Sequence, residues 1–442
     1  MKIWAGKWIA SGALAVLATG CVQRAEVSGP RVPADASGVN VLKTDFGVVA
    51  QIGATNKAGL CVLDRELRYL NTANSNPPAR PAPIVPDPLR PAVPPVPSPM
   101  PSPYIAGIQE NVYFSSGHAL TANVFREPGK PWVVHLGIIS PGLGDTMEGC
   151  KAYRTWYRVS TDEGKTFGPL KPVILKGDGY NLAHPVKGVW VATNSYAVDE
   201  TRPIVRASNG EIMVPFGYWP LGPDGKLYRP AHGFTYWDSG VLIGRWTPDG
   251  SDIEWTMGTW LGADPKRMPR GLEEPTIVEL RTPGEFLLVA RGGNDGTDLP
   301  GRKWVTVSRD YCRTWSKVEP FTYTDGDPLL SPGACSTLLR SRKNGRIYWI
   351  GNIAAQPTQG NSPRYPLVIG EVDENSRSLI RESVLVLDTR QPEYDSQRMQ
   401  LSNFHVHEDP ESGRLTVKLS RCDYDESNKF RGAPCWYLAG VP

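Results

Sequence analysis

A β-hairpin pattern in the second half of the chain constrains the fold most strongly. Residues 273–280 form an apolar, β-rich run, which is followed by a Pro-Gly turn at 281–284 and a second apolar run at 286–291. Two such runs around a short turn are typical of antiparallel strands. Because the open ends of a hairpin lie side by side, we expect Glu274 and Arg291 to meet at one edge of a sheet.

The same pattern occurs three more times. First strands are expected at 202–206, 335–339 and 402–406, and second strands at 211–216, 346–350 and 414–417. The turn glycines Gly210, Gly284, Gly345 and Gly413 are spaced by 74, 61 and 68 residues. A unit of this size with about four short strands indicates a β-propeller, in which neighbouring blades cover each other's faces.

The sequence therefore predicts an all-β fold. Five blades can be read directly, and we expect six, with the sixth built partly from the N-terminal segment or from residues 171–198. The chain of 442 residues has 45 glycines, 42 prolines and 14 tryptophans, which suits a turn-rich, aromatic-rich β protein. Its net charge of +3 gives no reason to expect a nucleic acid as partner.

The first 21 residues predict an export signal. Lys2 and Lys7 precede a short apolar run at 9–18, and the segment ends in Leu-Ala-Thr-Gly-Cys at Cys21. The apolar run is too short to span a bilayer. The pattern resembles a bacterial lipoprotein signal, in which the cysteine becomes lipidated; an ordinary secretory signal is the alternative. We expect a monomer in the bacterial cell envelope, anchored by lipid in the outer membrane or periplasm, or else secreted.

The composition then divides the exported chain. Residues 22–103 are expected to be a tether and a proline-rich linker, with a small strand-bearing segment at 41–70 that is either an appendage or a strand closing the ring. Residues 104–442 are expected to be the propeller. Six cysteines follow Cys21, an even number that permits disulfides in an oxidising compartment, and Cys422 with Cys435 is the best local pair.

A second, shorter motif recurs at the ends of expected third strands. Residues 160–167 read Ser-x-Asp-x-Gly-x-Thr-Phe, residues 308–315 repeat the pattern with Cys312 in place of the glycine, and residues 247–255 hold a degenerate copy. In such a turn the serine and aspartate can cap backbone amides, the glycine position takes a positive φ, and the aromatic ring packs beneath. We expect these turns to be structural.

These motifs resemble the Asp-box (BNR) repeats of the sialidase-like β-propellers. Residues 105–442 resemble that superfamily, in particular bacterial glycoside hydrolases related to exo-alpha-sialidases, or neuraminidases. The resemblance implies that Glu274 activates a nucleophile and that Arg291 and Arg364 bind a substrate carboxylate, a task for which the guanidinium fork is suited. It implies a glycan substrate, from which a terminal and acidic sugar is cleaved.

The sequence departs from the family at two places. Residues 115–118, which end in His118, stand where the family has its first arginine, and residues 401–404 stand where its tyrosine nucleophile is expected. The tyrosine mechanism then requires Tyr394 or Tyr365 to move into the site. A relative acting on an acidic sugar other than sialic acid therefore fits better than a sialidase in the strict sense.

Further candidates come from the other expected blades. Asp199 or Glu200 could protonate a leaving oxygen, and Arg202 could help to bind an acidic group. His232 and Tyr236 could transfer a proton beside a uronate carboxylate, which would make the chain a polysaccharide lyase. A non-catalytic carbohydrate-binding propeller is the third possibility. We expect no cofactor, and the sequence contains no recognisable metal site.

Overall fold

The computed structural model describes residues 43–44, 47–48, 56–67, 109–113, 119–139, 154–198, 203–230, 236–390, 392, 395–409, 411–424 and 430–442. The regular structure of these residues is β-strand, joined by turns and loops, and the helix among them is a single 3-10 turn, η3 (Arg381–Ser383). No helix in the described part of the chain is long and apolar enough to cross a membrane. The all-β class predicted from the sequence is confirmed.

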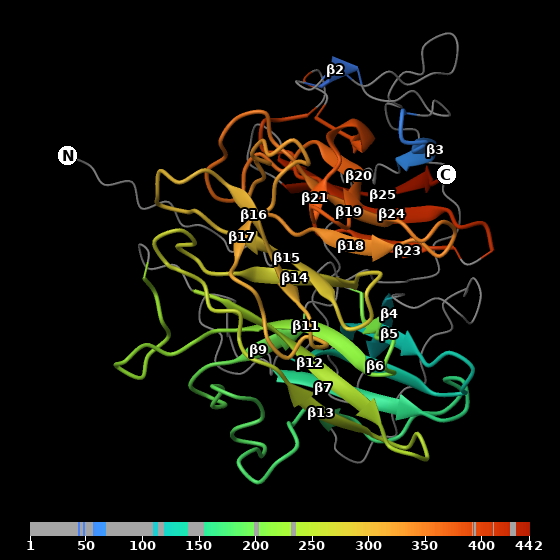
Figure 1. Cartoon of the computed structure of the whole chain (residues 1–442), viewed down its shortest axis with the longest axis vertical. Helices are drawn as coiled ribbons and strands as arrows, with labels where there is room; N and C mark the ends of the chain where they lie inside the picture. Colours follow the sequence, from blue (N-terminus) through green and yellow to red (C-terminus); the bar gives the residue numbers. More distant parts are fainter. Residues whose placement is uncertain are drawn as a thin grey trace.

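Five antiparallel sheets follow one another along the chain, as in a propeller (Figure 1). The first contains β4 (Gln109–Tyr113), β5 (Ala119–Arg126), β6 (Val133–Ile139), β7 (Arg154–Ser160) and β8 (Lys171–Pro172). The second contains β9 (Tyr196–Val198), β10 (Val205–Arg206), β11 (Ile212–Tyr218), β12 (Asp238–Trp246) and β13 (Ile253–Met257). The third contains β14 (Glu273–Glu279), β15 (Phe286–Gly292), β16 (Arg302–Ser308) and β17 (Glu319–Pro320).

The last two sheets complete the arrangement. The fourth contains β18 (Thr337–Arg340), β19 (Ile347–Asn352), β20 (Leu367–Asp373), β21 (Ser378–Leu379) and β22 (Leu385–Asp388). The fifth contains β23 (His405–Glu408), β24 (Leu415–Tyr424), β25 (Phe430–Gly440) and the N-terminal strand β3 (Cys61–Leu67). A separate two-strand hairpin is formed by β1 (Lys43–Thr44) and β2 (Gly47–Val48).

The N-terminal segment therefore supplies a strand to the last sheet, one of the two roles considered for it. β3 pairs antiparallel with β25, close to the C-terminus (Figure 1). Residues 171–198 contribute β8 and β9 to two different sheets instead of building a blade of their own. The described residues form five propeller sheets, so the sixth expected blade is not confirmed.

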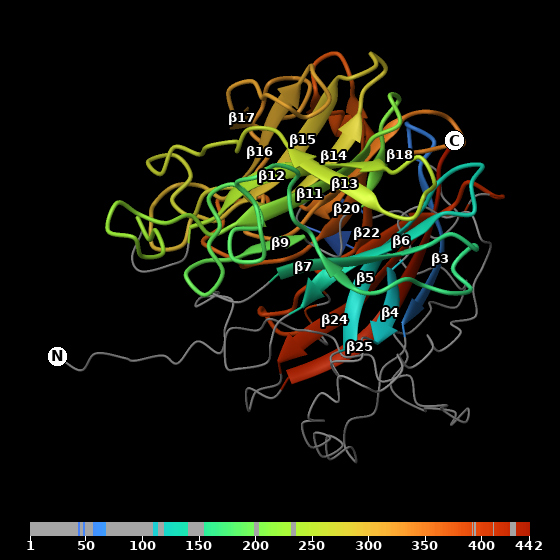
Figure 2. The same ribbon diagram turned by 90° about the horizontal axis from the view of Figure 1, so that it is seen from below.

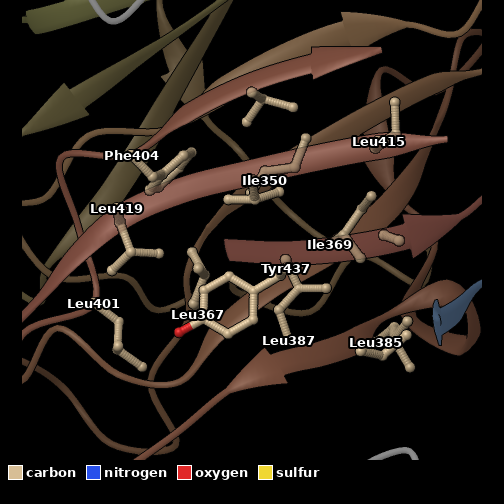
Figure 3. Close-up of a cluster of buried hydrophobic side chains, with 14 of the residues drawn as sticks. Ile350, Leu367, Ile369, Leu385, Leu387, Leu401, Phe404, Leu415, Leu419 and Tyr437 are labelled. Atoms are coloured by element: carbon tan, nitrogen blue, oxygen red, sulfur yellow. The ribbon is translucent and has the colours of Figure 1, made fainter. Parts of the chain in front are cut away.

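Hydrophobic clusters lie between successive sheets and hold the blades together. One joins the first two sheets, one the second and third, one the third and fourth, and one the fourth and fifth with β3. Figure 3 shows part of the last cluster, in which Ile350 and Ile369 of the fourth sheet face Leu415 and Tyr437 of the fifth. Blade faces that are apolar on both sides explain why the strands read as nearly continuous hydrophobic runs.

The third sheet has two chemically different ends. β14 begins at Glu273 and runs to the turn after Glu279, and β15 returns to Gly292, so Glu273 and Arg291 face each other at one end. β16 then runs away from that end and stops at Ser308, where the second Asp-box motif begins. Both views place β14 and β15 between the sheets of β11 and β18 (Figures 1 and 2), and β14 contacts both of those strands.

The Asp boxes have the local geometry that their sequence predicts. The Asp162 carboxylate accepts hydrogen bonds from the Thr166 amide at 2.8 Å and the Thr166 hydroxyl at 2.6 Å, and the Ser160 hydroxyl accepts one from the Gly164 amide at 2.8 Å. Gly164 has φ +86° and Cys312, at the same place in the second copy, has φ +63°. The degenerate copy closes on Asp249, which accepts hydrogen bonds from Thr247 and Ser251.

The predicted pairing of Cys422 with Cys435 is wrong. The two residues lie on the paired strands β24 and β25, but the register sets Cys435 opposite Leu419 and Cys422 opposite Gly432. Because neither cysteine lies opposite the other in this register, the two cannot form a disulfide unless the backbone moves. The two thiols are not bonded to each other.

Candidate active site

A single guanidinium joins two consecutive carboxylates where β14 begins. Arg291 donates a hydrogen bond from Nη1 to Oε1 of Glu274 at 2.8 Å, and its Nε lies 3.3 Å from Oε2 of Glu273. Successive side chains of a regular strand point to opposite faces. Here the register of β14 against β15 shifts after Glu273, and Glu274 has φ +48°. This bulge turns both carboxylates toward Arg291, and the backbone strain it carries is typical of functional positions.

A second arginine lies behind the first. Arg270 Nε lies 3.4 Å from Oε1 of Glu273, and Arg270 Nη1 donates to Oδ2 of Asp295 at 3.0 Å. Gly293 leaves room for this contact, since a Cβ there would lie 3.0 Å from Oε1 of Glu273 and 2.9 Å from Cδ of Arg270. Glu273 is thus enclosed by Arg270 and Arg291, and its burial raises the pKa of its carboxyl.

Arg364 provides a third guanidinium, with a different set of partners. It donates from Nη1 to Gln400 Oε1 and Ser402 Oγ, both at 3.2 Å, and from Nη2 to the Gly333 carbonyl at 2.8 Å. All three acceptors are neutral. Burial, and then the positive charge of Arg291, lower the pKa of Arg364 to about 10, so the side chain stays charged at neutral pH.

A lysine completes the cluster. Lys303 on β16 lies opposite Arg291 in the register of β15 and β16 and is fully buried. Its Nζ donates to the carbonyls of Pro332 at 2.9 Å and Ala334 at 2.6 Å. Burial, and then the charge of Arg291, lower the pKa of Lys303 to about 7.

The cluster gathers charges of both signs, and two of its atoms lack a hydrogen-bond partner among the described residues. Among the described residues it contains four cations against three carboxylates, namely Arg270, Arg291, Lys303 and Arg364 against Glu273, Glu274 and Asp295. Glu274 Oε2 and Arg364 Nε are buried atoms with no hydrogen-bond partner in the described structure. Since buried polar atoms are nearly always bonded, these two need an explanation, and a bound polar ligand supplies one.

The structure brings together three of the residues singled out from the sequence. Glu274, Arg291 and Arg364 belong to one cluster, and the meeting of Glu274 with Arg291 that the hairpin predicts is confirmed. His118, Asp199, Glu200, Arg202 and His232 lie outside the described residues. Tyr236 is buried, and its hydroxyl donates to the Ala263 carbonyl at 2.8 Å. Burial and the neighbouring Asp238 raise the pKa of Tyr236, which disfavours it as a base.

No tyrosine is found at the place that the family pattern gives to a nucleophile. Leu401 and Phe404 are fully buried in the hydrophobic cluster of Figure 3. Tyr365 packs partly buried against the same cluster, and Tyr394 lies outside the described residues.

Sequence reasoning missed five members of the cluster: Arg270, Glu273, Asp295, Lys303 and Asn361, which accepts from Arg291 Nη2 at 2.9 Å. Two signals were present. A lysine directly before the β-rich residues 304–307 is unusual for a strand buried on both faces. A Gly-Gly pair before Asp295 marks a close approach of backbone to side chain.

A further carboxyl group lies at the start of β12. Oδ1 of Asp238 accepts hydrogen bonds from the amides of Ser239 at 3.1 Å and Gly262 at 3.0 Å. The start of β12 is tied to residue 272, because Leu272 donates to the Trp237 carbonyl and accepts from the Ser239 hydroxyl at 2.7 Å. Burial raises the pKa of Asp238 to about 6.

Other charged groups of the described chain are occupied or scattered. A groove of about 590 Å³ beside β13 is lined by Arg245, Arg313 and Glu211, but these side chains pair with one another. In the part of the chain that the structure describes, no three His, Cys, Asp or Glu side chains gather as metal ligands would.

Comparisons with known proteins give matches at the level of structure alone. No protein-family model matches the sequence, and no curated protein is similar to it. Similar solved structures include the NanB sialidase from Streptococcus pneumoniae, with 15% identity, a TM-score of 0.40 and coverage of 65% of this chain and 36% of that chain. A Hadza microbial sialidase has 12% identity, a TM-score of 0.44 and coverage of 74% and 53%.

A third similar structure is an N-acetylgalactosamine deacetylase from F. plautii, with 14% identity, a TM-score of 0.40 and coverage of 77% of this chain and 96% of that chain. The chain thus spans about a third of the length of the pneumococcal sialidase and about half that of the Hadza enzyme.

Proposed function

We propose that this chain is a sialidase-like glycoside hydrolase that cleaves a terminal sugar bearing a carboxylate. One observation carries the proposal: Arg364 is a buried guanidinium bonded only to neutral acceptors in the described structure, and the charges of Arg291 and Glu274 act on it. An acidic substrate group would meet the arginines, and the glutamate would act on the bond being broken.

The charge balance supports an acidic ligand. Burying charged groups is costly unless they are paired, and the described part of the cluster holds four cations against three carboxylates when Lys303 is protonated. A carboxylate bound between Arg291 and Arg364 would add the missing negative charge and could accept a hydrogen bond from Arg364 Nε. Charge-assisted bonds of this kind are about twice as strong as neutral ones.

The orientation of Glu274 supports a chemical role. Its Oε1 is held by Arg291, whereas Oε2 has no partner among the described residues. Oε2 is thus the atom available to take a proton from a water or hydroxyl nucleophile. Among the described residues Asp238 suits the complementary task, because a carboxyl with a pKa of about 6 is largely ionised at pH 7 but keeps a protonated fraction for the leaving oxygen. Asp199 and Glu200 remain sequence-based candidates for the same task.

The lyase alternative receives less support. It needs a base, and the Tyr236 hydroxyl is engaged with Ala263 in surroundings that raise the pKa of Tyr236. A carbohydrate-binding propeller without catalysis would need the arginines but would not need the strained backbone that aims Glu274.

Mass spectrometry of products distinguishes these functions. The full chain would be incubated in detergent and ¹⁸O-labelled water with sialylated and uronate-containing glycans. We expect products that have gained one labelled oxygen, and their loss in Glu274→Gln but not in Glu279→Gln. Unsaturated products without added water would establish a lyase, and intact glycans with measurable binding would establish a binding protein.

We further propose that the chain is exported and anchored by a lipid on Cys21, as its N-terminal pattern predicts. Cys21→Ser should then move the protein from the membrane fraction to the soluble fraction and abolish the incorporation of labelled fatty acid. Membrane association that persists without lipid labelling would contradict the anchor.

A further inference from the structure

Lys303 occupies a position at which a charged side chain lowers the stability of the fold. It is fully buried and lies directly opposite Arg291 across β15 and β16, so two cations share one face of the sheet. Like charges placed opposite each other destabilise a sheet, and a buried ammonium must be compensated by partners. An apolar side chain would fill the interior of a strand at lower cost. The position therefore requires a reason beyond folding.

The partners of Lys303 give that reason. Its Nζ donates to the carbonyls of Pro332 and Ala334, at 2.9 and 2.6 Å, while the intervening carbonyl of Gly333 accepts from Arg364 Nη2 at 2.8 Å. The carbonyls of segment 332–334 thus alternate between two cations. The segment lies between the ammonium and the guanidinium, and each of its carbonyls compensates one of the two charges.

The same segment also reaches the partner of Arg291. A Cβ at Gly333 would lie 2.8 Å from Oδ1 of Asn361, the atom that accepts from Arg291 Nη2 at 2.9 Å. The Gly333 amide donates to the Gly360 carbonyl at 2.7 Å, which fixes the segment against residues 360–361. A displacement of the segment would therefore move both guanidiniums.

We propose that Lys303 is a positioning residue for a carboxylate-binding site: its ammonium group holds segment 332–334 in place, and this segment sets the Arg364 guanidinium beside Arg291. The inference rests on the proposed function, because it takes the acidic group of the substrate as the ligand. Lys303 itself does not touch that group. It acts through the carbonyl of Gly333 and adds a positive charge behind the arginines.

The role predicts a pH dependence. The charged and titratable groups that act on Lys303 are Arg291 on β15, Glu274 on β14, Cys335 before β18 and Arg364 before β20. When Lys303 loses its proton near pH 7, the cluster loses one positive charge. Binding of a carboxylate should then weaken as the pH rises from 6 to 8, and this change should be absent when residue 303 cannot titrate.

The test compares an acid with its methyl ester. The full chain in detergent would be titrated calorimetrically with N-acetylneuraminic acid, glucuronic acid and the methyl ester of each. We expect the wild type to prefer an acid over its ester. Lys303→Met should bind the acid at least about 10-fold more weakly with the ester unchanged, which removes the preference. Lys317→Met, at an exposed lysine of the same sheet region, is the matched control and should keep it.

Gly333→Ala provides a second route to the same site, since it displaces segment 332–334 without altering Lys303. We expect the same loss of preference in this variant, which keeps the test decisive if Lys303→Met does not fold. A folded Lys303→Met or Gly333→Ala protein that retains the preference overturns the positioning role and leaves the proposed function standing. A wild type with no preference for either acid contradicts the proposed function and, with it, the role of Lys303.

Discussion

The two ends of the third sheet use the same kinds of side chain for opposite purposes. At the Asp-box end, the Asp310 carboxylate accepts hydrogen bonds from Ser308, from the Thr314 amide and from the Thr314 hydroxyl, all within one turn. At the other end, Glu274 and Arg364 each keep a buried atom without a hydrogen-bond partner in the described structure. The Asp-box carboxylate is bonded within its own turn, whereas the other end gathers charges from distant segments and leaves some of their atoms without a partner in the described structure.

This difference separates structural from functional charge. A carboxylate bonded to its own turn stabilises that turn and has nothing left to offer a ligand. A buried, strained and partly unbonded cluster costs stability, and a fold keeps such a cluster where binding or catalysis uses it. The comparison therefore predicts that substitutions at the two ends will affect different measurements.

The largest expected effect concerns activity at the cluster. Glu274→Gln keeps the shape of the side chain and an oxygen to accept from Arg291, but it removes the basic oxygen Oε2. We expect kcat to fall by about 10²- to 10⁴-fold, the usual range for an acid–base group, with a small change in the temperature of unfolding. Rates of hydrolysis on the preferred glycan and a thermal melt of each protein measure this.

Glu279→Gln is the matched control, because Glu279 ends the same strand at the Asp-box end. Its carboxylate accepts from the Ser208 amide, the Ser208 hydroxyl and the Gly284 amide. We expect this variant to unfold at a lower temperature with kcat unchanged. Equal losses of kcat in the two variants would remove the distinction between the ends.

The sequence predicts contacts that are local and misses those that are not. The Asp boxes close within eight residues, and Glu274 meets Arg291 across one hairpin, so both follow from spacing and turn chemistry. Lys303, in contrast, acquires its role only because β16 pairs with β15 and because segment 332–334 packs against it. Periodicity alone does not reveal which residues meet across two neighbouring blades.

The sixth expected blade is not confirmed, for a related reason. The repeats show how many hairpins the chain has. They do not show that β3, from the opposite end of the sequence, pairs with β25 and completes the last sheet. In the sequence, a strand that pairs with a sheet so far along the chain looks like part of an additional blade. For Asp199, Glu200 and Arg202 the expectation from the sequence stays a prediction.

The second prediction uses the pH dependence of stability at the cluster. Lys303 has a pKa of about 7 in the folded chain, below its ordinary value of 10.5. Between these values the unfolded chain binds the extra proton, so stability should rise as the pH increases from 7 toward 10, by an amount on the order of a few kcal/mol. Urea unfolding of the wild type and of Lys303→Met at several pH values measures this contribution.

We expect the difference in unfolding free energy between these two proteins to change over that window, and the corresponding difference for Lys317→Met to stay constant. Parallel curves for the wild type and Lys303→Met would mean that the ammonium is not destabilised by its surroundings, and the cluster would then resemble the Asp-box end.

The third prediction concerns the Asp-box end. Asp310→Ala removes the acceptor of the Thr314 amide and hydroxyl, and the loss of such a capping group costs about 1–2 kcal/mol. Chemical unfolding should show this loss, and both kcat and KM should remain at wild-type values. A change in KM without a loss of stability would show that the Asp box takes part in binding.

The smallest expected effect is the acid dependence of Asp162. Hydrogen bonds from the Thr166 side chain, the Thr166 amide and the Ser160 hydroxyl lower the pKa of Asp162 to about 2, from an ordinary 3.8. Its contribution to stability is thus complete above pH 4 and is lost as the pH falls through 2. The unfolding temperatures of the wild type and Asp162→Asn should therefore converge between pH 4 and pH 2. A difference in unfolding temperature that stays constant over this range would mean that the turn does not depend on the ionised carboxylate. Hydrogen bonds within the turn would then no longer distinguish the Asp-box end from the cluster.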